Sequence, residues 1–325
     1  MTKISVALCT YNGEKFIHQQ IDSILNQTLK VDEIVICDDG SKDNTSNILL
    51  EYQNKLPGVF KIYNNEQNLR SVKNFEKAIS LCTGDIIFLS DQDDKWQTDK
   101  VETMLNYFLK NPQISVLATN GFALDGDDNT IERYSLWDVP RFLREKKINV
   151  DYFKIISNVS NIATGASMAI RKEYLEKILP FPILENFHHD EWIALVASSE
   201  KKFELLNEKL FYYREHSGQQ VGGVFFDKTP EEKKNLVKFF DLSLSQQDFS
   251  SFKKLIKKFS QSYKKSKSLL SKVSDKHKLH FIEKNLSVIE NEYWHAKKIM
   301  SKEYPLRTFL LNITDKIFNK RQLDK

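Results

Sequence analysis

Residues 85–96 read Asp-Ile-Ile-Phe-Leu-Ser-Asp-Gln-Asp-Asp-Lys-Trp, an apolar run that passes directly into an acidic cluster. The four consecutive apolar residues from Ile86 to Leu89 are typical of a short strand buried on both faces. Thr83 and Gly84, just before the run, are a turn signal. The segment therefore predicts a buried strand that delivers aspartates to one edge of a sheet.

Strand-like and helical patterns alternate on the N-terminal side of this segment. The expected strands cover 4–9, 33–37 and 59–63, and the expected helices cover 16–25, 45–52 and 71–81. Such alternation predicts an α/β protein with a mostly parallel, Rossmann-like sheet covered by helices on both faces. Ligands of these sheets bind beyond the carboxyl ends of the strands. The segments 10–12, 38–39 and 91–94 should all meet at that edge.

The aspartates at 91, 93 and 94 indicate a metal-dependent phosphate site. Acids repel the negative charge of a nucleotide diphosphate, so they need a divalent cation between them and the phosphates. Carboxylate oxygens suit Mn²⁺ or Mg²⁺, which can also act as a Lewis acid on the leaving diphosphate. Aspartate is also common in solvated turns and helix caps, so the cluster alone is a weak signal.

Seven ordered motifs together resemble those of the family 2 glycosyltransferases. They occupy 9–13, 38–43, 68 with 74, 89–96, 164–169, 189–192 and 213–216. The resemblance covers about residues 1–224. It implies the A-type glycosyltransferase fold and a metal-dependent, inverting, hexosyltransferase-type transfer from a nucleotide diphosphate sugar.

The resemblance also implies roles for single residues around the donor. Thr10, Tyr11, Asn12 and Asp39 are similar to residues of the base and ribose pocket, where Asp39 accepts from the pyrimidine imide. Asp91 is similar to an acid near the ribose.

Two further residues resemble metal-site positions. Asp93 is similar to the metal ligand of the family, and His216 to a residue that completes the metal or phosphate site. Arg70 and Lys73 are candidate diphosphate contacts, with ordinary helix-surface residues as the alternative. Arg70 departs from the glycine that is usual at its position.

The motif at 189–192 is where the family keeps its catalytic base. Asp190 is expected to deprotonate the acceptor hydroxyl as that hydroxyl attacks the anomeric carbon. Trp192 is expected on the substrate side, and His189 either orients Asp190 or lies on the surface. Motifs 91–96 and 189–192 look most like bacterial rhamnosyltransferases of capsule or cell-wall polysaccharide assembly. That likeness implies a deoxythymidine- or uridine-diphosphate sugar donor and a glycan acceptor, often lipid-linked.

Two other functions compete with sugar transfer. A sugar nucleotidyltransferase would need a glycine-rich, basic loop after the first strand, where residues 10–13 hold one glycine. A non-catalytic nucleotide-sugar-binding or scaffold protein would not need both Asp93 and Asp190. Sugar transfer with both residues present separates these alternatives.

Charge divides the chain into two predicted parts. Residues 1–224 carry 25 Lys and Arg against 32 Asp and Glu, net −7, whereas residues 225–325 carry 23 against 12, net +11. The first part is the predicted catalytic domain and the second a basic helical region. Apolar residues at helical spacing in that region are Phe252, Leu255, Ile256 and Phe259. They could face an anionic membrane, pack on the catalytic domain or pair two subunits. No nucleic-acid-binding motif accompanies the charge.

No apolar run in the sequence is long enough for a spanning helix or a signal peptide. We therefore expect a cytoplasmic catalytic domain, with a location at the inner face of the membrane as the alternative for the basic region. Cys9, Cys37 and Cys82 lie in apolar runs without metal-ligand spacing and are expected to be reduced core residues.

Overall fold

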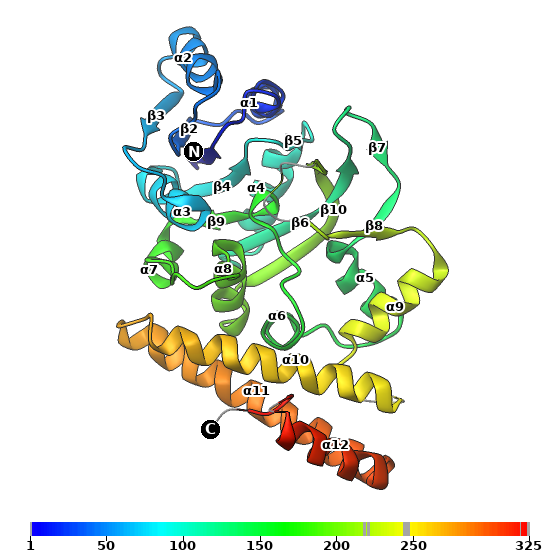
Figure 1. Ribbon diagram of the computed structural model, residues 1–325. Helices are drawn as coiled ribbons and strands as arrows, with labels where there is room; N and C mark the ends of the chain where they lie inside the picture. Colours follow the sequence, from blue (N-terminus) through cyan, green and yellow to red (C-terminus); the bar gives the residue numbers. More distant parts are fainter. Residues whose placement is uncertain (1, 217–218, 220–221, 243–247, 319, 324–325) are drawn as a thin grey trace.

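The computed structural model describes residues 2–216, 219, 222–242, 248–318 and 320–323 (Figure 1). Its first third alternates strand and helix as the sequence predicts. The elements are β1 (Ile4–Thr10), α1 (Ile17–Leu25), β2 (Glu33–Asp38), α2 (Thr45–Lys55), β3 (Phe60–Asn64), α3 (Arg70–Leu81) and β4 (Ile86–Asp91). β1, β2 and β4 are almost wholly buried because their apolar runs lie between two layers of helices.

The register of these strands aligns their carboxyl ends. The order is β3-β2-β1-β4, and all three pairs are parallel. Thr10 pairs with Asp38, and Cys9 pairs with Asp91. The loops that carry the predicted site residues therefore leave the sheet side by side.

The second half of the sheet departs from the parallel pattern. The three-residue strand β9 (Ala169–Arg171) lies between β4 and β6 (Val116–Leu124) and runs antiparallel to both. β10 (Phe203–Arg214) is parallel to β6, and β5 (Lys95–Trp96) pairs antiparallel with the end of β10. The sheet is thus mixed, and β9 brings the loop before it next to the end of β4. The short strand β7 (Thr130–Ile131) pairs with the end of β6. The helices of this half are α4 (Lys100–Lys110), α7 (Leu175–Ile178) and α8 (His189–Ser199).

The basic C-terminal region is helical, as expected, apart from a short strand at its start. β11 (Phe225–Asp227) pairs with β8 (Arg133–Ser135), so the residues directly after 224 continue the catalytic part. The helices are α9 (Pro230–Phe240), α10 (Phe249–Leu270), α11 (Lys276–Glu303) and α12 (Pro305–Ile317). α9 packs against α5 (Val139–Glu145), and α10 and α11 pack along each other and on α6 (Tyr152–Asn158).

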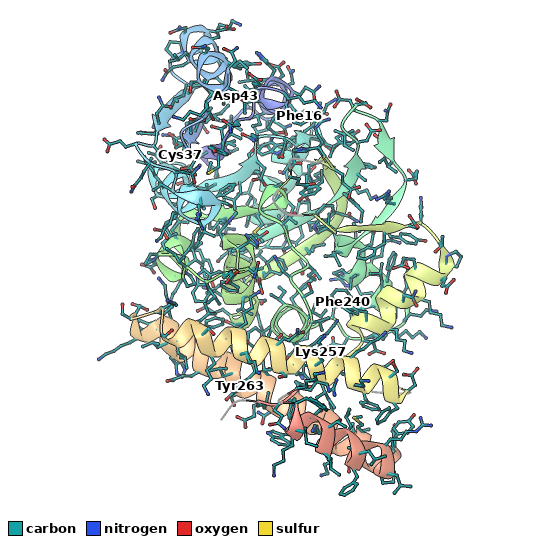
Figure 2. The ribbon with its side chains drawn as sticks, in the orientation of Figure 1. Phe16, Cys37, Asp43, Phe240, Lys257 and Tyr263 are labelled. Carbon is teal, nitrogen blue, oxygen red and sulfur yellow. The ribbon has the colours of Figure 1, made fainter. Side chains whose placement is uncertain are left out.

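The predicted apolar stripe of α10 is buried inside the C-terminal layer. Phe252, Leu255, Ile256 and Phe259 form a second core with apolar residues of α11 and α12. The stripe is therefore covered by α11 and α12 of its own region, an arrangement that the three roles left open for it did not include. Leu269 of α10 joins the main core of the sheet, so this layer is anchored to the catalytic part. Figure 2 labels Lys257 and Tyr263 on α10 in this layer, and Cys37 of β2 in the distant part of the molecule.

The three cysteines are buried and free, as predicted. Burial also raises the pKa of Cys37 to about 11. They are core residues.

Candidate active site at the carboxyl edge of the sheet

The loop after β1 is tied to the loop after β2 through Asn12. Asn12 has a φ of 50°, its N–H donates to Ser41 Oγ at 2.8 Å, and its Oδ1 accepts from the Lys42 N–H at 2.8 Å. Asparagine tolerates this left-handed backbone better than most residues. The side chain of Asn12 therefore shapes the two loops instead of being left free for a ligand.

The same loop is tied to the acidic cluster through Tyr11. Its N–H donates to Gln92 Oε1 at 2.8 Å, and Gln92 Nε2 donates to the Tyr11 carbonyl at 3.0 Å. A Cβ at residue 13 would lie 2.3 Å from Gln92 Oε1, which explains Gly13. The Tyr11 ring is 43% exposed, so it offers an open aromatic surface at the edge.

Thr10 lies beneath this surface. It is 2% exposed, and its hydroxyl donates to Asp38 Oδ2 at 2.7 Å. The prediction of a ligand contact by the Thr10 side chain is therefore corrected. Thr10 holds Asp38 and, through it, the turn at Gly40 and Ser41, whose N–H groups donate to the other oxygen of Asp38.

Asp39 clamps the start of α3. Its Oδ1 accepts from Asn65 Nδ2 and the Leu69 N–H, both at 2.7 Å, and its Oδ2 accepts from the Arg70 N–H at 2.8 Å. A carboxylate oxygen with one bond retains another lone pair, so Oδ2 keeps acceptor capacity for the predicted imide contact.

Arg70 and Lys73 differ in how freely their side chains could bind a phosphate. Arg70 has a φ of 61°, which is where glycine fits most easily, and its side chain is exposed. Lys73 Nζ lies 2.7 Å from Glu76 Oε1, and the other oxygen of Glu76 accepts from the Phe181 N–H at 2.6 Å. A phosphate would have to compete with Glu76 for Lys73, whereas Arg70 is open to one.

The acidic cluster combines two partly exposed acids, Asp91 and Asp93, with one buried acid, Asp94. Asp93 is 21% exposed, and its Oδ2 lies 2.9 Å from His216 Nε2. Asp94 is buried and accepts from the Arg214 N–H at 3.1 Å. Burial, with Asp93 and Asp190 nearby, raises the pKa of Asp91 to about 8, and burial also raises the pKa of Asp94. Clustered acids with raised pKa values make a site that favours a cation.

Lys100 supplies a buried positive charge behind the cluster, and the sequence analysis missed it. It is 0% exposed, its Nζ donates to the Ala166 carbonyl at 2.6 Å, and it lies 4.3 Å from the Trp96 ring centroid. Burial lowers its pKa to about 7, although Asp94 and Asp91 act in the opposite direction. A lysine in the first turn of a helix is usually solvated, so its type did not suggest burial. The only hint in the sequence was its place on the apolar side of the helix that became α4.

Arg214 fixes the backbone of Asp93 from the end of β10. Its Nε donates to the Asp93 carbonyl at 2.8 Å, and its two terminal nitrogens bond Asp128 and Gln19, each at 2.6 Å. The buried guanidinium lies 4.4 Å from the ring centroid of Phe16, which Figure 2 labels just before α1. His216 also contacts Phe16, at 5.1 Å between ring centroids. Arg214 thus fixes the backbone of Asp93, and Phe16, which Arg214 also contacts, packs against His216.

Asp190 lies in the first turn of α8. Its Oδ2 accepts from the Gly165 N–H at 3.2 Å, and its Oδ1 accepts from the Glu191 N–H at 2.7 Å. Burial raises the pKa of Asp190 to about 6, against the opposing effect of His188. Gly165 lies just before Met168, whose carbonyl accepts from the Leu89 N–H at 3.0 Å, so Asp190 is held next to the end of β4. Glu191 is held by Lys265 of α10 at 2.6 Å.

His189 is neither on the surface nor bonded to Asp190. Both of its ring nitrogens are buried without a hydrogen-bond partner among the described residues, and the ring stacks on Phe75 at 4.1 Å. Burial lowers its pKa to about 3, so the imidazole is neutral. A Cβ at residue 165 would lie 2.7 Å from His189 Nε2, which explains Gly165.

Trp192 is a correction to the predicted substrate contacts. It is 0% exposed, its indole N–H donates to the Ile178 carbonyl at 2.9 Å, and its ring packs edge-on against Phe187 and Phe281. A side chain that is enclosed in this way cannot touch a substrate. Trp192 belongs to the core that holds α8.

The residues at this edge fit a divalent cation only in part. Among the described residues, no three His, Cys, Asp or Glu side chains are grouped as a complete metal site. Asp93 and His216 supply one oxygen and one nitrogen ligand side by side. A divalent ion that is held by few protein ligands takes its remaining ligands from water and phosphate oxygens. The pair therefore suits an ion that arrives with a nucleotide diphosphate.

Two surface hollows lie elsewhere. One, of about 420 Å³, lies between α8 and α11, and the other, of about 510 Å³, lies around Arg171 and Glu173. Neither is lined by a predicted site residue. The predicted site residues lie instead at the carboxyl edge of the sheet.

Comparison with known proteins decides the family. The sequence profile of glycosyl transferase family 2 matches residues 5–179, more than half of the chain. The chain belongs to this family. The match contains Asp39, Asp91 and Asp93, whereas Asp190 and His216 lie beyond it.

Characterised and uncharacterised relatives share about the same identity with this family member. This chain is 28% identical over 245 residues to the dTDP-rhamnosyl transferase RfbG of Shigella flexneri. The match covers 71% of this chain and 79% of that protein. The chain is 29% identical over 219 residues to an uncharacterized glycosyltransferase of Nostoc sp., covering 66% of this chain and 65% of the relative. A chondroitin synthase of Pasteurella multocida is 28% identical over 305 residues, or 94% of this chain but 29% of that protein.

Solved structures show that this family member has the A-type glycosyltransferase fold, as predicted. Residues 1–349 of S. aureus TarS in complex with UDP-GlcNAc superpose with a TM-score of 0.52 at 18% identity, covering 93% of this chain and 91% of that one. A mannosyltransferase of Pyrobaculum calidifontis, in complex with GDP-Man and Mn²⁺, gives 0.50 at 13% identity, with 98% and 80% covered. In the described parts of the chain, no helix has the length and apolar content to cross a membrane.

Proposed function

We propose that this chain transfers a sugar from a nucleotide diphosphate donor to a glycan acceptor, in a metal-dependent, inverting reaction of the hexosyltransferase type. The observation that carries the proposal is the meeting of two carboxylate groups at one sheet edge. Asp93 beside His216 forms the donor side, and Asp190, at the start of α8, forms the acceptor side. Asp190 accepts from Gly165, just before Met168, whose carbonyl accepts from the Leu89 N–H of β4. Membership of glycosyl transferase family 2 supports this division of roles.

On the donor side, the exposed Tyr11 ring suits a nucleotide base, and Oδ2 of Asp39 can accept from an imide N–H. Asp91 lies nearest the ribose by the family resemblance, and the exposed Arg70 can bind phosphate oxygens bidentately. Asp93 and His216 would hold Mn²⁺ or Mg²⁺. When bound, such an ion neutralises the leaving diphosphate as a Lewis acid.

On the acceptor side, Asp190 removes the proton of the attacking hydroxyl. The new bond joins the acceptor oxygen to the anomeric carbon, and the bond from that carbon to the phosphate oxygen breaks on the opposite face. The proton ends on Asp190, and the electron pair leaves with the diphosphate. A base with a pKa of about 6 is ionised at neutral pH yet still able to take up a proton.

Two of the similar proteins support a class of donor. RfbG is named a dTDP-rhamnosyl transferase, and TarS was solved with UDP-GlcNAc. We therefore propose a deoxythymidine- or uridine-diphosphate sugar, with rhamnose as one candidate. The acceptor is a growing capsule or cell-wall glycan, often lipid-linked, used at the cytoplasmic side of the membrane. The chain spans 65% of the Nostoc relative and 29% of the chondroitin synthase, and their whole activities are not transferred to it.

A panel of nucleotide sugars tests the proposal. The purified full chain is melted with dTDP-rhamnose, UDP-GlcNAc or GDP-mannose, with Mn²⁺ or with EDTA, and release of nucleoside diphosphate is then measured. A donor at 100 times its Kd stabilises the native state by about 2.7 kcal/mol. A donor of the right class should therefore raise the melting midpoint when Mn²⁺ is present and not when EDTA is present.

The two alternatives give different outcomes in the same experiment. Binding without any diphosphate release, even with added acceptor glycans, would favour the non-catalytic binding protein. Release of pyrophosphate from a nucleoside triphosphate and a sugar phosphate would favour the nucleotidyltransferase. Indifference of the chain to every donor in the presence of Mn²⁺ would refute the site itself.

A further inference from the structure

Helix α12 has an apolar face that the described parts of the chain leave uncovered. Five side chains at spacings of 3, 4, 7 and 11 residues are between 42% and 80% exposed: Leu306, Phe309, Leu310, Ile313 and Ile317. These spacings place them on one stripe of the helix, about 100° wide. Contiguous apolar surface of this kind is uncommon on a monomer and marks an interaction site.

The opposite side of α12 is already used for packing, so the apolar face cannot turn inward. Thr308, Leu311 and Asp315 are buried, and the Thr308 hydroxyl donates to the Met300 carbonyl of α11 at 3.0 Å. The carboxylate of Asp315 is paired with Arg321. These contacts fix the rotation of the helix. Figure 1 shows α12 at the outer end of the C-terminal layer, on the far side of α10 and α11 from the sheet.

Cations border the apolar stripe on both sides. On a helical projection, Arg307 and Lys316 lie about 100° and 80° from Leu306 in opposite directions, and both are exposed. Lys302 and Lys320, also exposed, lie just before and after the helix. Among the described residues around α12, Glu303 at the end of α11 is an exposed acid, whereas Asp315 is buried. An apolar stripe with basic borders is the pattern of a helix that lies in the plane of an anionic membrane surface.

A second copy of the chain fits this face less well than a membrane does. In a symmetric contact the apolar stripes of two copies would meet, and Arg307 and Lys316 of both copies would be brought together. Five side chains are also fewer than the roughly 20–30 residues that each partner contributes to a stable interface. Anionic lipid headgroups, in contrast, complement the basic borders, and the acyl region accepts the apolar stripe.

We propose that α12 is a membrane-surface anchor, whose stripe from Leu306 to Ile317 enters the interface of an anionic lipid bilayer while Arg307 and Lys316 bind its headgroups. This surface is distinct from the stripe of α10, which is buried. The proposal does not depend on sugar transfer, because it is tested by binding to lipid alone.

Vesicle flotation of the full chain tests the anchor. Vesicles of 70% phosphatidylcholine and 30% phosphatidylglycerol should carry the chain at low salt and release most of it at high salt. Phe309→Ser/Leu310→Ser should weaken binding tenfold or more. Arg307→Gln/Lys316→Gln should weaken it on the order of 25-fold, about fivefold for each cation, and flatten the salt dependence.

Leu50→Ser/Leu109→Ser is the matched control, because both leucines are exposed on other helices. It should float like the unchanged chain. All these side chains are exposed, so the melting midpoints should agree. Failure of the unchanged chain to float, or flotation of Phe309→Ser/Leu310→Ser at the unchanged level, would overturn the anchor. A dimer that this double variant separates, without any vesicle binding, would assign the face to a second copy and also overturn it.

Discussion

The acid limb of the pH–rate profile should report the carboxyl of Asp190. A general base acts only when it is deprotonated, so kcat/KM follows its ionised fraction in the free enzyme. Burial raises the pKa of Asp190 to about 6. With that pKa about 90% of the carboxyl is ionised at pH 7 and about 10% at pH 5, so kcat/KM should fall roughly ninefold between them. An aspartate with an ordinary pKa of about 3.9 would lose less than about 10% over the same range.

The assay measures diphosphate release at saturating Mn²⁺, so that loss of metal does not limit the rate. Asp190→Asn should lower kcat by on the order of 10²-fold or more, with donor binding largely kept, and should remove the acid limb. Glu191→Gln is the matched control, since Glu191 lies next to Asp190 but is paired with Lys265. It should keep the limb near pH 6. A profile that is flat from pH 5 to 7, or an Asp190→Asn enzyme with near-normal turnover, would refute the assignment of the base.

Two substitutions test the surroundings of the site, and a third tests a hydrogen-bonded carboxylate at the amino edge of the sheet. Lys100→Met removes a buried positive charge behind Asp91 and Asp94 that repels a bound cation, so the Mn²⁺ concentration for half-maximal activity should fall roughly tenfold, about 1.4 kcal/mol, while the melting midpoint holds or rises; an unchanged metal requirement would contradict this role. Trp192→Phe should lower the melting midpoint but leave the donor KM unchanged, because the indole is core; a raised KM at unchanged stability would restore it to the substrate contacts. Glu33→Gln should lower the free energy of unfolding by about 2 kcal/mol at pH 7. Burial raises the pKa of Glu33, but hydrogen bonds from Lys61, Ser5 and Thr83 outweigh it and lower the pKa to about 2, so this stabilisation is present above pH 4.5 and is lost as the pH falls toward 2. A difference between variant and parent that persists at pH 2 would contradict that linkage.

The convergence of the loops could be predicted because it depends on local patterns. Apolar runs and turn signals determined the first four strands, and parallel strands bring their carboxyl ends together. Asp39, Asp91 and Asp93 therefore lie at the edge where they were expected. The three-residue strand β9 was missed because so short a run carries no periodic signal, and its pairing is long-range.

Residues of the expected types proved harder to place as buried or exposed. Trp192 stands two positions from Asp190, and only the packing of α8 shows that its ring is enclosed. Lys100 was missed because lysine is rarely buried unless it is paired. In α10 the apolar spacing was recognised, but spacing cannot say which partner covers a stripe. The structure covers the stripe of α10 and leaves that of α12 open.

The metal-dependent binding of a nucleotide diphosphate tests the central claim most directly. Titration calorimetry of the full chain with UDP or dTDP, in Mn²⁺ or in EDTA, is compared with Asp93→Ala. The nearby, exposed Asp99→Ala serves as control. The unchanged chain and the control should bind nucleotide with Mn²⁺ and at least tenfold more weakly in EDTA, whereas Asp93→Ala should bind weakly in both. Equal binding by the unchanged chain with and without metal, or unchanged metal dependence in Asp93→Ala, would contradict the claim.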